Sequence, residues 1–457
     1  MVTRREATYL AAFAVAAVYF LIWPLWRAQF PLEIWPTESW NAYFQDTAAQ
    51  WKSVYPSAGQ LISNNYPPLS FYAVGALSHL FGDALYVGRA LSFVALFAVA
   101  VEIAAAVVLL GGTRLFGALG GLWFVASMAH LSLSYVGADD PQLTGLAIMG
   151  AGLVWFLARE RDGQSCLPAL LLMVCAGFWK HNIIAIPLTA VLWLACTRTW
   201  RAIDTIAASI VAAALGLAAC GLLFGPDFFS NLLAPRSYSL WLVIPHLGHL
   251  QWQGIAYLVW ALWFLSAKQT YAARFTRLHI GVALLTCVLQ WIGDGVAQNA
   301  EFDLMLSLGI GVGLALSHAQ AMWSARKWGT DRTRDAIVVL LLLRLLASTR
   351  QEPARVLFSP NFRAAFAVAS QIVARDVARV AALPGEVYCD NKTICRFAGK
   401  PFVVDEFVLE QMIATGAATK QQIADMLKAR GITSFVTAPM ASEYVVTQAA
   451  LNAKASD

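Results

Sequence analysis

Long apolar runs separated by short polar segments make up most of the chain. The first runs from Ala7 to Trp26, and ten more lie at 88–110, 115–136, 141–158, 165–179, 183–197, 203–224, 252–267, 278–293, 304–322 and 335–349. About 20 consecutive apolar residues are enough to cross a bilayer as a helix. The pattern therefore predicts a polytopic α-helical membrane protein with about eleven transmembrane helices.

One shorter apolar run, at 67–81, decides the topology. It covers about 15 residues and opens with a proline pair, so we expect an outer-face juxtamembrane or re-entrant helix. With this assignment, the basic residues between the spans fall in cytoplasmic loops, as the positive-inside rule requires. They are Arg114, Arg159, Arg161, Arg198, Arg201, Lys268, Arg274, Arg277, Arg326, Lys327, Arg332 and Arg334. The N-terminus is then cytoplasmic, and the first span is a retained signal anchor.

After Arg350 the hydropathy falls. Residues 360–383 predict a helix that ends at Pro384-Gly385, and Thr419 is placed to cap a helix formed by "KQQIADMLKAR". The segments "EVYC", "FVV" and "ITSFVT" predict short strands. The tail thus predicts a small soluble α/β domain.

The expected organisation is a membrane domain, residues 1–350, with a first outer loop at 31–87, followed by a soluble domain at 351–457. Cys389 and Cys395 in this tail are compatible with a disulfide in an oxidising compartment, and two unpaired thiols are the alternative.

Composition agrees with the membrane class. The 457 residues are 59% hydrophobic and 13% charged, with a mean hydropathy of +0.60. The net charge of +5 is accounted for by basic residues at cytoplasmic helix ends. No basic run and no platform of aromatic and basic residues occurs, so we expect no nucleic-acid partner.

The remaining polar residues gather in the loops assigned to the outer face. They are Glu33, Glu38 and Asp46, then Asp139 and Asp140, then Lys180, His181 and Asn182, then Asp227, Arg236, Tyr238, His246 and His249 in the loop 225–251, and finally Asp294, Gln298, Asn299, Glu301 and Asp303. A polar rim over an apolar bundle predicts a reaction chamber. Glu102 is the single acid clearly inside a span, which disfavours a proton-coupled transporter.

Several short motifs follow in order along the outer face. They are "NNYPPLSFY", "GDALYVGRALS", "ADDPQLTG", "FWKHN" and the tail segment "PGEVYCDNKTICRFAGKPFVVDEF". Together they resemble the bacterial lipid-linked glycosyltransferases of the C-type fold, the superfamily of the protein mannosyltransferases and aminoarabinose transferases. The resemblance covers nearly the whole chain.

This resemblance implies an inverting transfer of a sugar from a polyprenyl-phosphate carrier to a lipid, glycan or protein acceptor at the periplasmic face of the inner membrane. Glu38 is the first candidate for the general base, and Asp139, Asp140 and Asp46 follow. Glu38, Asp139 and Asp140 would also be the ligands if a divalent cation, Mg²⁺ or Mn²⁺, takes part.

The resemblance also implies a place for the carrier and the sugar. Lys180, His181 and Arg236 are the candidates for holding the phosphate. Further candidates for substrate binding are Asn182, Tyr66, Trp40, Tyr43, Asn299 and Glu301. For the loop aromatics, an interfacial aromatic belt is the favoured alternative, and membrane lipids are the expected surroundings.

One departure from the family pattern leaves alternatives open. The family's first loop usually carries an aspartate-glutamate pair, whereas "WPTESWNAY" has Thr37 before Glu38. Glu38 or Asp46 then replaces the aspartate, or the chain is impaired as an enzyme. Each candidate also has a structural alternative. Glu38 is then an acidic residue at the start of a helix, and the two aspartates cap a helix. Lys180 and His181 are then side chains at the end of a span that extend towards the membrane interface. The alternative functions are a non-catalytic lipid or polysaccharide transporter and an assembly subunit of an envelope glycan complex.

Overall fold

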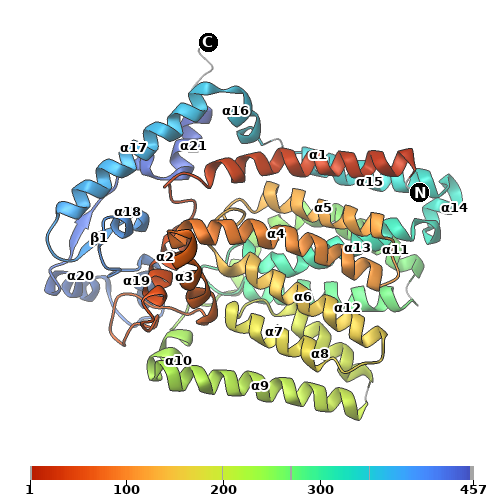
Figure 1. Ribbon diagram of the computed structural model, residues 1–457, viewed down its shortest axis with the longest axis horizontal. Helices are drawn as coiled ribbons and strands as arrows, with labels where there is room; N and C mark the ends of the chain where they lie inside the picture. The colour runs from red at the N-terminus through yellow and green to blue at the C-terminus, as the bar shows by residue number, and fades with distance from the viewer. Residues whose placement is uncertain (1–2, 198, 268–269, 349, 453–457) are drawn as a thin grey trace.

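The computed structural model describes residues 3–197, 199–267, 270–348 and 350–452. A bundle of long helices carries a smaller α/β module at one end (Figure 1). The bundle helices are α1 (Arg4–Arg27), α4 (Ala84–Leu109), α5 (Arg114–Leu131), α6 (Pro141–Arg161), α7 (Leu167–Trp179), α8 (Ala185–Thr197), α9 (Trp200–Phe224), α11 (Val243–Ala267), α12 (Tyr271–Gln290), α13 (Phe302–Ser317) and α15 (Thr330–Leu346). Each predicted span thus contains a helix.

Length and hydropathy decide which of these helices could cross a bilayer. Among the described residues, seven helices are long and apolar enough, or eight if the tail helices α16 (Glu352–Phe358) and α17 (Pro360–Ala382), which meet at 97°, count as a single span. Helices α7 and α8 are apolar but short. The chain is a multi-pass α-helical membrane protein, as expected, and the number of eleven spans stays a prediction.

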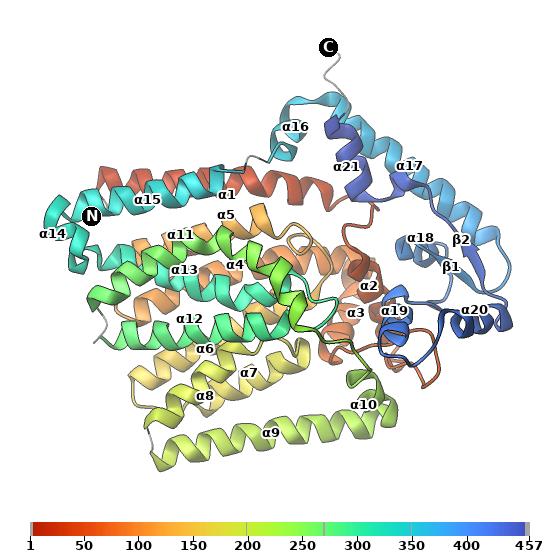
Figure 2. The same ribbon diagram turned by 180° about the vertical axis from the view of Figure 1, so that it is seen from behind.

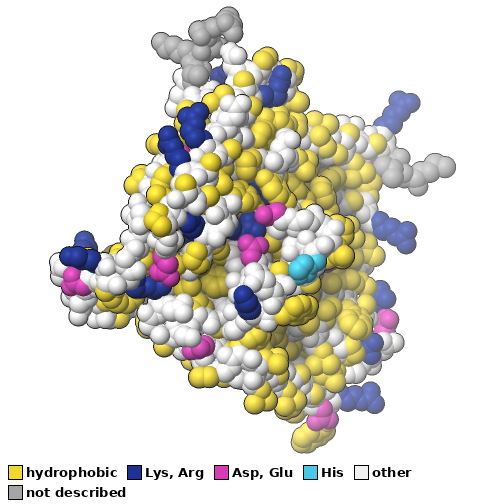
Figure 3. Space-filling model, turned by 60° about the vertical axis from the view of Figure 1, so that its left-hand side comes forward, with side chains coloured by type: hydrophobic (Ala, Val, Ile, Leu, Met, Phe, Trp, Pro, Cys, Tyr) yellow, Lys and Arg dark blue, Asp and Glu magenta, His cyan; other side chains and the backbone are white. Residues whose placement is uncertain are grey.

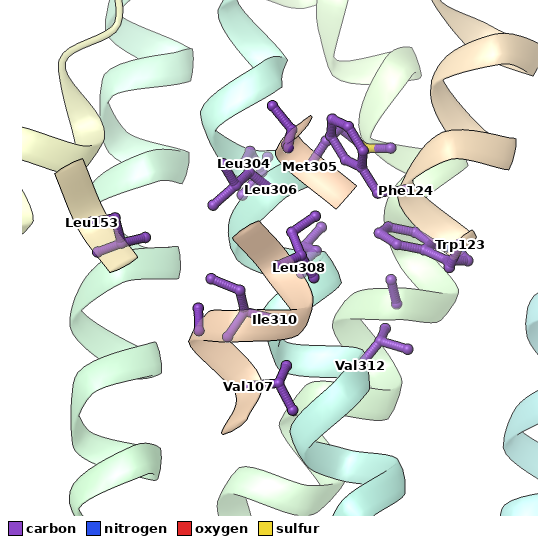
Figure 4. Packing of buried hydrophobic residues seen from close by; sticks show 14 of the residues in the cluster. Val107, Trp123, Phe124, Leu153, Leu304, Met305, Leu306, Leu308, Ile310 and Val312 are labelled. Carbon is purple, nitrogen blue, oxygen red and sulfur yellow. The ribbon is translucent and has the colours of Figure 1, made fainter. Parts of the chain in front are cut away.

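The centre of the bundle is α13, which is buried along its whole length. Its apolar side chains pack against α4, α5 and their neighbours, and Figure 4 shows Leu306, Leu308 and Ile310 among Val107 and Phe124. Close approach depends on small residues, because a Cβ atom at position 120 would lie 2.4 Å from the carbonyl oxygen of Gly309. Burial of these apolar side chains holds the helices that carry the loops described below.

Two short helices lie across the module end of the bundle. Helices α2 (Pro36–Ala49) and α3 (Leu69–Phe81) pack on each other and on α4, between the bundle and the module (Figures 1 and 2). Helix α3 begins directly after the proline pair and has only 13 residues. The first loop therefore contains two helices, and their juxtamembrane placement stays a prediction.

The module confirms most of the elements predicted in the tail. Helix α17 (Pro360–Ala382) follows α16 (Glu352–Phe358), and Thr419 caps α20 (Lys420–Ala429) with a capping box. Strand β1 (Val387–Cys389) pairs in parallel with β2 (Thr433–Phe435), and Cys389 is bonded to Cys395. The remaining module helices are α18 (Lys392–Phe397), α19 (Glu406–Ala414) and α21 (Glu443–Asn452).

Two local predictions were wrong. "FVV" at 402–404 forms no strand, because this segment makes only one bridge, between Val404 and Leu61 of the first loop. The predicted loop 225–251 contains α10 (Pro226–Leu232), the 3-10 turn η1 (Leu240–Leu242) and the start of α11, so His246 and His249 are helical. Histidine and glutamine lower the hydropathy of this stretch without preventing a helix, which is why the span prediction began too late.

Charge separates along the bundle axis. The described basic residues assigned to the cytoplasm lie in the helix ends opposite the module (Figure 1). Arg198 and Lys268 lie outside the described residues. In Figure 3 the module end is turned forward: acidic and basic side chains gather near its centre, and further Lys and Arg side chains project along the opposite edge. This separation agrees with the positive-inside assignment.

Candidate active site

Glu38 forms a buried ion pair with Arg89 of α4. In the pair, Nε of Arg89 lies 2.6 Å from Oε1 of Glu38, and Nη2 lies 2.7 Å from Oε2. The backbone amides of Ile34 and Asp139 also donate to this carboxylate, each at 3.0 Å, and Glu38 is only 1% exposed. The other guanidinium N–H groups donate to the carbonyls of Ala28, Phe30 and Leu32. These contacts support a role for Glu38 in joining the first loop to α4 and to the loop before α6.

The two aspartates after α5 point in different directions. The side chain of Asp140 caps α6 by accepting a hydrogen bond from the amide of Gln142 at 2.8 Å, so the predicted helix cap is confirmed for this residue. Asp139 points towards α2, where it accepts a hydrogen bond from Gln45, and its Oδ2 has no partner among the described residues. Burial raises the pKa of both carboxyl groups, that of Asp139 well above its usual value, while the charge of Lys180 opposes the rise at Asp140.

Lys180 follows the last residue of α7 and turns its ammonium group inwards. Nζ lies 3.1 Å from the centroid of the Tyr66 ring, and the residue is 1% exposed. Nζ has no hydrogen-bond partner among residues 3–452 as the structure describes them. Burial lowers the pKa of Lys180 to about 8, and the carboxylate of Asp140 works against this shift.

Arg236 adds a second positive charge near this ammonium group, whereas burial lowers the pKa of His181 to about 4 and leaves its ring neutral. The charge of Arg236 also lowers the pKa of Lys180, and the Arg236 side chain is held by the carbonyl of Asp294 at 2.7 Å. The ring of His181 lies 6.2 Å from that of Tyr66. Tyr66, Asp140, Lys180, His181 and Arg236 thus come together from four separate loops, and we refer to them as the Lys180 cluster.

The other predicted site residues lie outside this cluster. Asp46 accepts two hydrogen bonds from Arg396 of the module, at 2.7 and 2.8 Å. Trp40 packs on Phe44, Tyr66 and Phe71, while Tyr43 stacks on Phe402. Asn182 donates to Gln290, Asn299 pairs with Gln142, and Glu301 accepts hydrogen bonds from His249 and Gln253.

The three carboxylates considered as metal ligands do not fit a cation site. The two oxygens of Glu38 face the guanidinium of Arg89, one oxygen of Asp140 caps α6, and Asp139 points towards Gln45. Within the described part of the chain, no group of three His, Cys, Asp or Glu side chains is placed to hold a metal ion.

Comparison with known proteins identifies the fold. No known protein family and no curated protein matches the sequence. Among solved structures, ArnT from Cupriavidus metallidurans in the apo state matches with a TM-score of 0.57 at 15% identity, over 94% of this chain and 89% of that one. The same protein bound to undecaprenyl phosphate matches with a TM-score of 0.56 at 16% identity, over 93% and 90%. The chain has the ArnT fold. The fold implied by the sequence motifs is thereby confirmed.

Within this ArnT-like fold, the sequence analysis missed Arg89. It stands in "GDALYVGRALS", near the start of a span on the predicted outer side, where the positive-inside rule disfavours a basic residue. Lys180 is likewise a basic residue on the predicted outer side, and for this reason the sequence indicated it as a candidate. Gln45, which donates to Asp139, carried no comparable signal, because uncharged polar residues are common in outer loops.

Proposed function

We propose that this chain is an inverting glycosyltransferase that moves a sugar from a polyprenyl-phosphate carrier to an acceptor at the periplasmic face of the inner membrane. The observation that carries the proposal is the ammonium group of Lys180, which is buried and has no hydrogen-bond acceptor among the described residues. A buried charge is costly unless it is paired. A phosphate oxygen supplies the missing acceptor, and undecaprenyl phosphate is the ligand in one of the ArnT structures.

The Lys180 cluster supplies both groups that the reaction needs. Asp140, beside Lys180, takes the proton of the acceptor hydroxyl or amine as a general base, and its raised pKa improves its match to neutral pH. The acceptor atom attacks the anomeric carbon while the bond between this carbon and the phosphate oxygen breaks. The carrier phosphate leaves with the electron pair and needs no proton. A single displacement inverts the anomeric carbon.

Positive charge stabilises the departing phosphate. The positive charge of Arg236 and the negative charge of Asp140 both act on Lys180, so a phosphate bound at Lys180 interacts with two cations and one acid. Such fixed charges stabilise the leaving group as its charge develops. Glu38 has a positioning role, because its carboxylate accepts a hydrogen bond from the backbone amide of Asp139, the residue next to the base.

The periplasmic placement is supported by two features of the chain. The basic residues of the loops lie at the end opposite the Lys180 cluster, as the positive-inside rule requires for a cluster on the outer side. The disulfide between Cys389 and Cys395 suits an oxidising compartment. Lipid, glycan and protein acceptors all satisfy the same chemistry.

Binding of the carrier tests this proposal. We expect Lys180→Met to weaken binding of undecaprenyl phosphate to the purified protein in nanodiscs by about tenfold or more, since a charge-assisted hydrogen bond is lost. Lys52→Met is the matched control, because Lys52 is exposed and its ammonium group donates to Gln50. Equal affinity of Lys180→Met and the native protein would contradict the proposed phosphate site.

A second candidate function is a non-catalytic subunit that binds the same carrier. Thr37 stands where the family usually has an aspartate, and the carboxylate of Glu38 is occupied by Arg89. Such a subunit would bind undecaprenyl phosphate through Lys180 and would transfer no sugar.

A further inference from the structure

A second polar site lies behind the Lys180 cluster. It is a cavity of about 310 Å³ between the end of α5, the first half of α11, the start of α13 and the connection from α15 to α16. The lining includes Ser132, Trp252, Gln253, Glu301 and Arg350. The volume is at the lower end of the range for small-molecule sites.

A wall of side chains separates this cavity from the Lys180 cluster. Tyr135 packs edge-on against Phe302, with the ring centroids 5.0 Å apart, and Gln142 is hydrogen-bonded to Asn299. The Tyr135 hydroxyl interacts electrostatically with two carboxylates, that of Asp140 in the Lys180 cluster and that of Glu301 in the cavity. Tyr135 therefore lies between the two sites. The cavity thus adjoins the proposed reaction centre across these side chains.

The polar groups of the cavity are fixed in place. Glu301 accepts hydrogen bonds from Nδ1 of His249 at 3.0 Å and from Nε2 of Gln253 at 2.8 Å. Gln253 is 1% exposed, and its Oε1 has no hydrogen-bond partner among the described residues. A buried amide oxygen without a donor is costly, so a ligand hydroxyl would satisfy it.

The composition of the lining indicates the class of ligand. One histidine and one carboxylate are too few to hold a metal ion, and the carboxylate disfavours a phosphate. Amide, carboxylate, hydroxyl and guanidinium groups can donate and accept hydrogen bonds in several directions, as a ring of hydroxyl groups requires. Trp252 adds an aromatic ring, over which the guanidinium of Arg344 lies 3.9 Å from the ring centroid.

We propose that this cavity is a carbohydrate subsite that holds one sugar ring, with Gln253 and Glu301 binding its hydroxyl groups. The inference rests on the proposed glycosyltransferase function and extends it, because it gives the substrate a second point of recognition. The sugar comes either from the donor or from a glycan acceptor, since both present the same hydroxyl chemistry.

Binding of simple glycosides to the full-length protein in nanodiscs tests this subsite without requiring transfer. The probes are the methyl glycosides of a neutral hexose, an amino sugar and a pentose, followed by saturation-transfer NMR. We expect saturable binding of at least one probe and a tenfold or larger loss of affinity in Gln253→Leu. Gln251→Leu is the control, because Gln251 lies on the same helix but is exposed.

A second variant guards against misfolding of Gln253→Leu. Ser348→Trp places a large side chain in the lining at a position that is only partly buried, and we expect it to abolish glycoside binding while binding of undecaprenyl phosphate persists. The subsite is refuted if none of the three glycosides binds saturably, or if their binding is unchanged in both variants.

A non-transferable phosphonate analogue of the sugar-linked carrier distinguishes the two sources. Displacement of the glycoside by this analogue assigns the cavity to the donor sugar, and binding of both together assigns it to a glycan acceptor. The proposed phosphate site is tested separately: if Lys180→Met binds undecaprenyl phosphate as tightly as the native protein, that site is wrong, whatever the glycosides do.

Discussion

At the scale of single residues, two kinds of buried charge lie at the module end of the bundle. The pair of Glu38 and Arg89 is internally satisfied, with every carboxylate contact made to a donor of the chain. Lys180 is buried to the same degree but has no such partner within the described ranges. The first arrangement is expected of a structural ion pair, and the second of an anion-binding site.

The pKa of Lys180 predicts how carrier binding depends on pH. The ammonium form prevails below about pH 8, so affinity for undecaprenyl phosphate should be high at pH 7.5 and fall as the pH rises. We expect a drop of about tenfold by pH 9.5, a range in which the charge of a phosphate monoester stays nearly constant. In Lys180→Arg the affinity should stay level over the same range, because a guanidinium remains charged. An equal decline in both proteins would show that another group titrates.

The pair of Glu38 and Arg89 predicts a loss of stability. Removing one partner leaves a buried charge alone, which typically costs about 3–5 kcal/mol. Glu38→Gln and Arg89→Met should therefore each lower the free energy of unfolding, and the double variant should lose less than the sum of the two. Thermal unfolding in detergent measures this coupling. If Glu38→Gln kept full stability and yet lost sugar transfer, Glu38 would be a catalytic residue.

At the scale of elements, the module is fixed to the membrane bundle by charge and by aromatic packing. Arg396 of α18 reaches Asp46 of α2 and also Asp83, which caps α4, at 2.9 Å. Trp23 of α1 packs against Phe362 and Phe366 of α17. The position of α2 in the first loop therefore depends on Arg396, which is 350 residues further along the chain than Asp46.

Loss of Arg396 should loosen this docking. In Arg396→Met the carboxylates of Asp46 and Asp83 lose a guanidinium that is almost completely buried. We expect amide hydrogen exchange to become at least tenfold faster in α2 and α18. Arg430→Met is the control, since Arg430 makes a more exposed pair with Glu386, and such pairs contribute little. Unchanged exchange in Arg396→Met would mean that the aromatic contacts suffice.

At the scale of the whole molecule, hydropathy predicted the membrane class and the positions of the bundle helices. It failed at α11, because helix formation does not require the apolar composition that a span search measures. The short motifs predicted the ArnT fold through their order and common face.

The candidate site could be predicted only in part. Lys180 was accessible to sequence reasoning, since a lysine on the predicted outer side breaks the charge rule. The partners of Glu38 and Asp46 were not, because Arg89 and Arg396 are distant in sequence and no spacing rule links them to these acids. Only the folded chain shows that both carboxylates are already paired.

Sugar transfer by the purified protein, from a panel of labelled polyprenyl-phosphate sugars to membrane lipids and glycans, tests the proposed glycosyltransferase function. We predict transfer by the native chain, with inversion at the anomeric carbon. Asp140→Asn should lower the rate by about 100-fold or more while still binding undecaprenyl phosphate, as loss of a general base implies. Gln60→Asn, an exposed change in the first loop, should leave it unaltered. If the native chain bound the carrier tightly but transferred no sugar from any donor, the proposed glycosyltransferase activity would be contradicted. That result would favour the non-catalytic carrier-binding subunit.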